Sequence, residues 1–532
     1  MAENSRERAG SGSSDQGASE ALVRGLLEPD AYPHETDAIE LVETHISWVL
    51  LTGPYAYKVK KPLALPFLDF STLERRRHFC DEELRLNRRL APQLYLDVVP
   101  IGGRPGSPRV GEEPAIEYAV KLRQFPPDAT ADRRLEAGAV SAEDIRRLAE
   151  RIARFHAELP PAEAPPVVRH AIDNLEELEQ ALERAGRPRS VARLREWTQA
   201  QCEALRDVLD ERARGGAIRE GHGDLHLENV VEVEGELLPF DALEFDRGMR
   251  CVDVVDEAAF LIMDLRAHGR PDLAARFLNR YFEITGDYPG ARLLTFYVVY
   301  RALVRAKVRA LKASQPHAVR SLGESVDPYL RLAESSTERR TPLLLITHGL
   351  SGSGKTTVTE RLLAELPAVR IRSDLERKRL HGVDAAEHGN LAVGAGRYDR
   401  ASSDRTYETL ARFAADALAG GLDTIVDAAF LTRSRRSDFR ALAGRCGAAF
   451  VILDCAAAED TLRARIRARA AARSDASEAT EAVLDAQLRS AEPIGADERP
   501  VALRVDTSGE IDYGSLCEAL LARRSSSTNA AR

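Results

Sequence analysis

The stretch Gly349-Leu350-Ser351-Gly352-Ser353-Gly354-Lys355-Thr356 decides the fold of the C-terminal part of this 532-residue chain. It has the composition and spacing of a phosphate-binding P-loop, it follows an apolar run over Leu343–Thr347, and it opens a helix predicted over Lys355–Leu366. Its glycines allow backbone N–H groups to wrap around phosphates, and the helix N-terminus adds positive potential. The stretch therefore predicts a nucleotide site in a strand–loop–helix unit.

Individual side chains of this unit have distinct expected tasks toward ATP. Lys355 is expected to reach the β- and γ-phosphates as a catalytic group, and the Thr356 hydroxyl is expected to bind magnesium. Asp427 ends the apolar strand Thr424–Val426, like a Walker-B acid, and is expected to orient magnesium through water. The loop residues expected to bind the nucleotide are Gly349, Ser351, Gly352, Ser353, Gly354, Lys355, Thr356 and Thr357.

Strands and helices alternate beyond the P-loop. The pattern predicts strands over Val369–Ser373, Thr424–Ala428 and Phe450–Asp454 and a helix over Asp404–Ala419. Such alternation is typical of a doubly wound parallel sheet. The C-terminal part is therefore predicted to be an α/β P-loop domain.

The stretch Ile371-Arg372-Ser373-Asp374-Leu375-Glu376-Arg377-Lys378 follows the second strand of this domain. It resembles the S-D-x-x-R element of small P-loop kinases such as gluconate kinase, zeta toxin, chloramphenicol phosphotransferase and polynucleotide kinase. By that resemblance Asp374 is a catalytic residue that meets the acceptor hydroxyl. Arg377 is expected to bind the acceptor or its phosphate.

An arginine-rich segment, Leu462–Arg469, and the following Arg473–Ser477 resemble the lid of the same kinases, a pattern that ends at Gln487. A lid arginine stabilises charge on the transferring phosphoryl group. Arg465 and Arg469 are the expected nucleotide contacts. Alternating arginines also fit a solvated helix face.

A second phosphate-handling motif is His222-Gly223-Asp224-Leu225-His226-Leu227-Glu228-Asn229, followed after a predicted hairpin by Phe240-Asp241-Ala242-Leu243-Glu244. Phosphoryl transfer needs an acid that orients the attacking hydroxyl, and amide or carboxylate groups that hold magnesium against the phosphates. Asp224, Asn229 and Asp241 have the spacing for these tasks.

This constellation resembles the aminoglycoside phosphotransferase family, which includes choline-kinase-like enzymes and is built on the protein-kinase plan. The resemblance implies that Asp224 is the catalytic base, that Asn229 and Asp241 are magnesium ligands, and that Glu244 orders the site. It covers about residues 30–330 and is strongest at 222–245.

Supporting residues lie upstream of this motif. Ala56-Tyr57-Lys58 resembles the kinase strand whose lysine contacts the α- and β-phosphates, so Lys58 is an expected nucleotide contact. Alternation places Lys60 on the same strand face, and either lysine fits the role. Glu82 or Glu83 on the next helix is the expected partner, and Tyr118–Phe125 is the expected hinge strand beside adenine. The predicted phosphate-covering loop, Leu51–Tyr55, has a single glycine, Gly53.

The order of the two motifs resembles bacterial bifunctional aminoglycoside phosphotransferase/ATP-binding proteins. The expected fold is an α+β, protein-kinase-like bilobal domain followed by an α/β P-loop domain. The expected boundaries are a disordered tail over 1–25, a kinase-like domain over 26–332, a linker over 333–341, a P-loop domain over 342–523 and a disordered tail over 524–532. Arg301, Arg305 and Arg309 share one predicted helix face, interpreted as solvated rather than as an anion site.

The bulk composition narrows the function classes. A net charge of −9 argues against a general nucleic-acid binder, which needs a basic surface. The six cysteines are scattered and form no CxxC pair, so the sequence predicts neither a zinc site nor a disulfide framework, and a reducing compartment is expected. The sequence shows no signal peptide, and its apolar runs stay under the roughly 18 residues of a membrane helix. A cytoplasmic location without membrane attachment is expected.

The leading hypothesis is a kinase that uses ATP and Mg²⁺ to phosphorylate a hydroxyl of a small molecule. One alternative is a P-loop kinase or ATPase regulated by a degenerate N-terminal lobe, which the single glycine Gly53 favours. Another is a nucleic-acid 5′-hydroxyl kinase, which resembles this chain at Ser373–Arg377 but fits the acidic balance poorly. A toxin-like role rests only on the likeness to zeta toxin.

Overall fold

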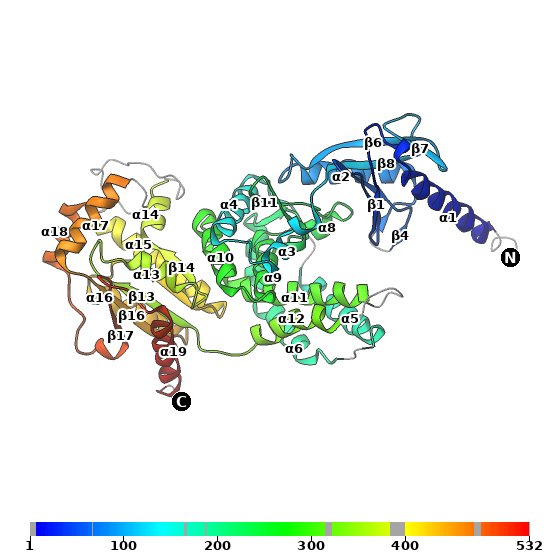
Figure 1. Cartoon of the computed structure of the whole chain (residues 1–532). Coiled ribbons are helices and arrows are strands. Elements are labelled where there is room, and N and C mark those ends of the chain that lie inside the picture. The colour runs from blue at the N-terminus through cyan, green and yellow to red at the C-terminus, as the bar shows by residue number, and fades with distance from the viewer. Residues whose placement is uncertain are drawn as a thin grey trace. The chain divides into compact units, whose positions relative to one another are not determined.

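The computed structural model describes residues 7–65, 68–163, 167–186, 189–313, 322–382, 400–472 and 480–530. The chain divides into two compact units, whose helices and strands are labelled in Figure 1. The first unit comprises Met1–Ser141, Leu159–Pro165 and Gly216–Asp253, and the second comprises Ala142–Glu158, Pro166–Gly215 and Val254–Arg532.

The first unit is built on a six-stranded antiparallel sheet in the order β1-β2-β3-β8-β6-β7. The strands are β1 (Glu40–Glu43), β2 (Ser47–Leu51), β3 (Tyr55–Lys60), β6 (Tyr95–Arg104), β7 (Ser107–Val110) and β8 (Glu117–Arg123). β2 and β3 pair across the turn that contains Gly53. Helix α2 (Leu73–Asn87) begins at Thr72, whose side chain accepts a hydrogen bond from the Arg75 backbone N–H, as an N-cap does.

Two short pairs of strands in the first unit flank the His222–Asn229 motif. Strands β9 (Ile218–Glu220) and β12 (Cys251–Asp253) pair antiparallel, and β10 (Val230–Val233) pairs with β11 (Glu236–Pro239) in the predicted hairpin. The other elements are α1 (Glu7–Leu26), α3 (Ala131–Glu136), α8 (Arg247–Arg250), and the short strands β4 (Ala64–Leu65) and β5 (Leu68–Asp69).

The second unit combines a group of helices with a P-loop sheet. The helices are α4 (Ala142–Glu158), α5 (Val167–Arg184), α6 (Ala192–Ala204), α7 (Arg206–Arg214), α9 (Val254–Ala267), α10 (Pro271–Thr285), α11 (Ala291–Ala313) and α12 (Leu322–Ser336). They pack through buried apolar faces, as the amphipathic pattern of α4 illustrates with Ile145, Leu148 and Ile152.

The P-loop sheet has five parallel strands in the order β14-β15-β13-β16-β17. The strands are β13 (Leu343–His348), β14 (Val369–Arg372), β15 (Thr424–Asp427), β16 (Ala449–Ala456) and β17 (Ala502–Asp506). The central strands are nearly continuous buried apolar runs, as parallel strands covered on both faces are. The helices of this part are α13 (Lys355–Leu362), α14 (Ser373–Leu380), α15 (Arg400–Ala419), α16 (Arg433–Arg445), α17 (Glu459–Ala472), α18 (Glu481–Ser490) and α19 (Tyr513–Ala530).

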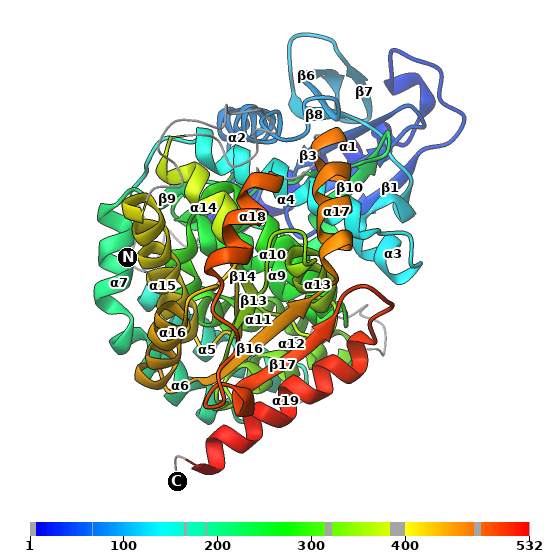
Figure 2. The same ribbon diagram turned by 90° about the vertical axis from the view of Figure 1, so that its left-hand side faces the viewer.

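Helices cover both faces of this sheet (Figures 1 and 2). On one face, residues of α13 and α19 such as Leu362 and Leu520 share a core with Leu345 and Val451. Helices α15 and α16 also pack against the sheet, and the ring of Phe439 in α16 contacts the ring of Phe430. The predicted doubly wound α/β P-loop fold is therefore confirmed, and an α+β, protein-kinase-like part precedes it, as expected.

Both predicted disordered tails differ from the structure. Helix α1 spans Glu7–Leu26, and near its end Leu22 and Leu26, one turn apart, bury their side chains in the core that contains Leu50 and Tyr57. At the other end, helix α19 continues to Ala530. The predicted linker over 333–341 is also shorter, since α12 runs to Ser336 and β13 begins at Leu343.

The compact units do not follow the predicted domain boundaries, because the helices of 254–336 cluster with the P-loop sheet. The separate domains over 26–332 and 342–523 therefore remain a prediction. None of the helices in the described residues combines the length and apolarity of a membrane span.

The interpretation of the Arg301 face as solvated is wrong. Arg301 is buried and holds Asp256 of α9 in a two-pronged ion pair, with Nε and Nη2 at 2.7 and 2.8 Å from the carboxylate oxygens. Arg305 is buried beside the ring of Tyr329. Sequence spacing showed a shared face, but the acid that neutralises Arg301 lies 45 residues away in the chain.

Candidate active sites

The P-loop backbone has the shape that phosphate binding requires. Gly349 has a φ of 145°, and a Cβ there would come within 2.4 Å of the Cys455 carbonyl oxygen, so only glycine fits. The loop ends at Gly354, and α13 begins at Lys355 with its N–H groups toward the loop. This junction of a glycine-rich loop and a helix N-terminus is an anion site.

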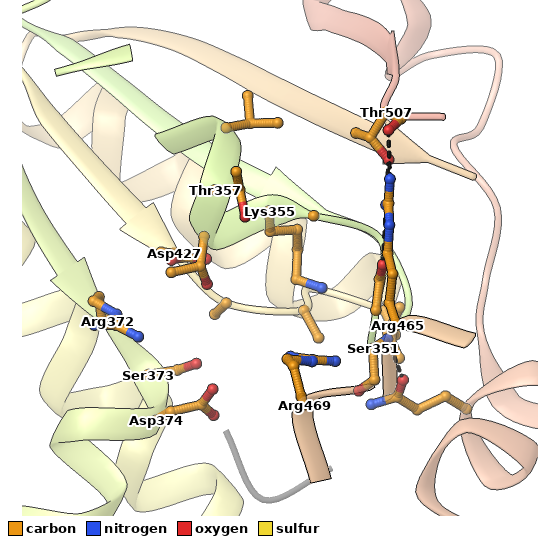
Figure 3. A pocket seen from close by; sticks show the side chains of 18 of the residues that line it. Ser351, Lys355, Thr357, Arg372, Ser373, Asp374, Asp427, Arg465, Arg469 and Thr507 are labelled. Carbon is orange, nitrogen blue, oxygen red and sulfur yellow. Dashed lines mark hydrogen bonds between the residues drawn. The ribbon is translucent and has the colours of Figure 1, made fainter. Parts of the chain in front are cut away.

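A cavity of about 690 Å³ opens beside this loop (Figure 3). The predicted site residues that line it are Ser351, Gly352, Gly354, Lys355, Thr356, Thr357, Asp374, Arg377, Asp427, Arg465 and Arg469. The other two predicted loop residues, Gly349 and Ser353, line a second cavity of about 260 Å³ on the loop. Every predicted P-loop residue therefore lines one of the two cavities at this loop.

Lys355 lies at the centre of the larger cavity, with Asp427 on one side of it (Figure 3). Its ammonium donates hydrogen bonds to the carbonyl oxygens of Gly349 (2.9 Å) and Leu350 (2.8 Å). Burial lowers the pKa of Lys355 below its ordinary value, and the nearby Asp427 partly offsets that effect. A phosphate at this position would replace the carbonyl oxygens as a stronger, charged partner.

The magnesium-binding prediction is consistent with the donor atoms present. Asp427 ends β15, and Thr359 of α13 donates its hydroxyl to the Asp427 carboxylate at 3.3 Å. Thr356 lines the same cavity as Asp427. A hydroxyl and a carboxylate are the hard oxygen ligands that Mg²⁺ takes together with phosphate oxygens and water.

The side of the cavity that carries Asp374 begins where β14 ends. Ser373 and Asp374 open α14, and Figure 3 shows both beside Arg372 across from Lys355. Arg377 lies 3.5 Å from the Asp374 carboxylate, one turn along α14. The cavity is also lined by Ser403, Tyr407 and Arg435, three residues that sequence analysis did not find.

The two predicted lid arginines are placed differently. Arg465 is tied to Thr507, donating from Nη1 to the hydroxyl (3.1 Å) and from Nη2 to the carbonyl oxygen (2.6 Å), so it is no solvated residue. Arg469 points into the cavity near Lys355 (Figure 3). Gln487 accepts a hydrogen bond from the Ser351 backbone N–H at 2.8 Å. The predicted lid segment Arg473–Ser477 lies outside the described residues.

The His222–Asn229 motif forms a compact loop in the first unit. Gly223 has a φ of 83°, and a Cβ there would meet Arg250 at 2.9 Å. The Asn229 amide donates to the Asp224 carboxylate at 3.0 Å and to the Asp224 carbonyl oxygen at 2.9 Å. The His222 ring lies 2.9 Å from the carbonyl oxygen of Phe240, which links this loop to the next predicted metal ligand.

Asp241 is held in an unusual backbone conformation, with a φ of 61°. Its N–H donates to the Tyr95 hydroxyl at 3.0 Å, and the following N–H, of Ala242, donates to the side chain of Asn87 at 2.9 Å. Such strain is found at ligand-binding positions when neighbours hold it in place. Tyr95 and Asn87 were missed by sequence analysis, because their roles depend on strand and helix packing.

Both lysines of β3 bind Glu83, which decides between the two predicted partners. Lys58 lies 2.9 Å from Glu83 and 2.5 Å from Asp241, while Lys60 lies 2.7 Å from Glu83 and also binds Glu244. Lys60 and Glu83 are fully buried. Lys58 therefore contacts the predicted metal ligand Asp241, whereas Lys60 binds Glu244.

The charges in this cluster are unequal, since three carboxylates face two lysines. Burial alone would raise the pKa of Glu83, but Lys58 and Lys60 lower it to about 2. Burial raises the pKa of Glu244 above its ordinary value despite Lys60. Of these two carboxylates, Glu83 therefore keeps its negative charge to the lower pH. Among the described residues, no group of three or more His, Cys, Asp or Glu side chains is arranged as a metal site.

The fold and the P-loop geometry together define a nucleotide-binding P-loop domain joined to a protein-kinase-like part. The family described as "AAA domain" matches residues 344–494 of the chain. The chain is 32% identical over 470 residues to the uncharacterized protein Rv2004c of Mycobacterium tuberculosis (strain ATCC 25618 / H37Rv), covering 86% of this chain and 92% of that relative. The uncharacterized protein Mb2027c of Mycobacterium bovis matches equally. The chain belongs to the family of these mycobacterial proteins.

Two solved structures show more distant similarity. A choline/ethanolamine kinase family protein from Mesorhizobium loti is 11% identical, with 61% of this chain and 95% of that chain covered and a TM-score of 0.37. A putative kinase from Chloroflexus aurantiacus is 21% identical, with 36% and 100% covered and a TM-score of 0.29. At these TM-scores the site geometry, not the likeness, carries the functional argument.

Proposed function

We propose that this chain is an ATP- and Mg²⁺-dependent phosphotransferase that transfers the γ-phosphoryl group to a hydroxyl of a small molecule. The observation that carries the proposal is one cavity that contains a phosphate-binding loop, Lys355, Asp427 and, on its other side, Asp374. A nucleotide-binding ATPase needs the first three groups. Transfer to a hydroxyl needs, in addition, a carboxylate on the acceptor side that can take the hydroxyl proton.

The proposed reaction assigns a task to each of these groups. The acceptor hydroxyl oxygen attacks the γ-phosphorus, its proton passes to the Asp374 carboxylate, and the bond to the β-phosphate oxygen breaks so that ADP leaves. Lys355 and Arg469 stabilise the negative charge on the phosphates, and Arg465 and Gln487 hold the loop that surrounds them. Bound magnesium, on Thr356 and Asp427, would neutralise phosphate charge. Arg377 would orient Asp374 or the acceptor.

The first unit is proposed as a second phosphotransfer site of the same kind. Asp224 would accept the hydroxyl proton, Asn229 and Asp241 would hold magnesium, and Lys58 would contact the nucleotide. Their support is the Asn229–Asp224 hydrogen bond at 3.0 Å and the contact of Lys58 with both Glu83 and Asp241. This is the lysine–glutamate–aspartate arrangement that protein-kinase-like catalysis uses.

A regulatory first unit is the second candidate. It is favoured by the single glycine at Gly53, whose N–H already binds the Gln124 side chain at 2.9 Å. A nucleic-acid 5′-hydroxyl acceptor is a weaker candidate, because the net charge of −9 opposes binding to a phosphate backbone.

The test is magnesium-dependent ATP consumption by wild type, Asp224→Asn and Lys355→Met, with and without sugars, aminoglycosides, nucleosides and a 5′-hydroxyl oligonucleotide. Loss of acceptor-stimulated turnover by about 100-fold in Lys355→Met is expected from removing one phosphate-stabilising group. Asp460→Asn, an exposed change on α17, is the control. If Asp224→Asn removes a distinct activity, the first unit is also an enzyme; if it changes nothing, the first unit is a binding module. Full activity in Lys355→Met would refute the proposal.

A further inference from the structure

The edge of the P-loop sheet at β14 is completed by the side chain of Asn279, from helix α10. The Asn279 amide nitrogen donates to the carbonyl oxygen of Ala368 at 2.8 Å, and its oxygen accepts from the Arg370 N–H at 2.6 Å. An edge strand exposes such N–H and C=O groups, and a carboxamide can satisfy one of each. Asn279 is buried, so this is an internal contact and not a surface pair. α10 lies beside β14 in Figures 1 and 2.

Glu283, one helical turn beyond Asn279, binds the side chains of the same strand. Its carboxylate lies 2.9 Å from the Arg370 guanidinium and 3.8 Å from that of Arg372. Burial alone would raise the pKa of Glu283, but Arg370 and Arg372 keep it below its ordinary value. Arg370 also binds Glu360 of α13 at 2.5 Å, so one guanidinium joins α10 to the helix of the P-loop.

The contact continues onto the helix that carries the acceptor residues. Arg379 of α14 donates to the Glu283 carbonyl oxygen at 2.7 Å. The Tyr288 hydroxyl donates to the Arg370 carbonyl oxygen at 3.4 Å, and its ring stacks on Phe413 of α15 at 5.0 Å. β14 ends at Arg372 and α14 begins at Ser373, so the strand end and the helix are both held from α10 and the residues that follow it.

We propose that Asn279 and Glu283 are positioning residues for the P-loop site, which fix the strand end and helix start on which Arg372, Ser373 and Asp374 stand. The inference rests on the proposed phosphotransfer at that site. α10 precedes the matched AAA domain, residues 344–494, by more than one element, so the acceptor side of this domain depends on a helix outside it. Helix α10, which lies before the P-loop in the chain, is therefore part of the structure that supports the P-loop site.

The first test measures backbone hydrogen exchange of the full chain over residues 369–376. In Asn279→Asp and Glu283→Gln, exchange in this segment is expected to accelerate by about tenfold or more, because its hydrogen bonds open locally. The matched control is Asp256→Asn, which removes another buried carboxylate partner of an arginine in the same unit, away from β14. It is expected to leave this segment as in wild type.

The second test separates positioning from stability. With ADP binding by calorimetry unchanged within about twofold, acceptor-dependent turnover should fall about tenfold or more in both α10 variants, since small misplacement of reacting groups costs this much or more. Unchanged exchange at 369–376, or equal acceleration in Asp256→Asn, would overturn the inference. If hydrogen exchange changes as expected but the protein shows no phosphotransfer, the proposed function is refuted. The inference that α10 stabilises β14 would then still be supported.

Discussion

Replacement of Glu83 by glutamine is expected to destabilise the first unit strongly, in a pH-dependent manner. Glu83 is fully buried between Lys58 and Lys60, at 2.9 and 2.7 Å, and glutamine keeps its size while removing its charge. Two lysines would then face one carboxylate fewer inside the protein. Breaking a buried ion pair from one side costs about 3–5 kcal/mol.

The pKa gives a separate route to the same magnitude. Lys58 and Lys60, acting against burial, lower the pKa of Glu83 to about 2, whereas an unfolded glutamate has a pKa of about 4.3. A difference of roughly two units corresponds to about 3 kcal/mol of folding free energy. Because the folded pKa is the lower one, this stability is present above about pH 4.3 and is lost as the pH falls toward 2.

The assay is urea unfolding followed by fluorescence in a Trp197→Phe background, which leaves Trp48 of β2 as the only tryptophan and a reporter of the first unit. Glu83→Gln should lower the unfolding free energy by about 3 kcal/mol at pH 7, and the deficit should shrink below about pH 4. The matched control is Glu43→Gln, whose exposed pair with Lys61 should be worth less than about 1 kcal/mol. A deficit that matches the control, or one that does not change with pH, would refute the reasoning about this cluster.

Three further changes test the rest of the account. Gly349→Ala should abolish nucleotide binding, since its Cβ would lie 2.4 Å from a carbonyl oxygen; ADP titration by calorimetry checks this, and wild-type affinity would contradict it. Lys58→Met should lower first-unit activity by about 100-fold while Lys60→Met mainly lowers stability, measured by turnover and by urea midpoints, and the reverse pattern would exchange their roles. Asp427→Asn should raise the magnesium concentration needed for half-maximal turnover, and an unchanged magnesium curve would remove Asp427 from the metal site.

Sequence spacing predicted most of the P-loop domain because its motif is local. The strand, the loop and the helix start follow one another in the chain, so the residues that wrap phosphate are adjacent in sequence and in space. Asp427 was predicted because it ends an apolar strand, and Asp374 because its segment resembles the S-D-x-x-R element of small P-loop kinases. The carboxyl ends of parallel strands share one edge, which is why both lie at the same cavity. Thr507, which binds Arg465, directly follows the last strand and has no local signal in the sequence.

Local sequence patterns did not identify the partners of several buried charged residues. Alternation placed Lys58 and Lys60 on one strand face, but only the packed structure shows Lys58 at Asp241 and Lys60 at Glu244. The arginine face at Arg301 was misinterpreted for the same reason, because its partner comes from another helix. Leu22 and Leu26 follow a Ser/Gly-rich stretch, and that composition led to the prediction of a disordered tail instead of a helix.

The measurement that tests the central claim most directly is transfer of labelled γ-phosphate from ATP to a pool of small hydroxyl compounds, compared between wild type and Lys355→Met. Both proteins carry Asp224→Asn as well, so that the proposed first-unit site does not contribute. The account predicts a labelled organic phosphate with Lys355 intact and magnesium present, and about 100-fold less with Lys355→Met. Label that appears only as inorganic phosphate across the whole pool, or organic transfer that Lys355→Met does not reduce in this background, would contradict phosphotransfer at the P-loop site.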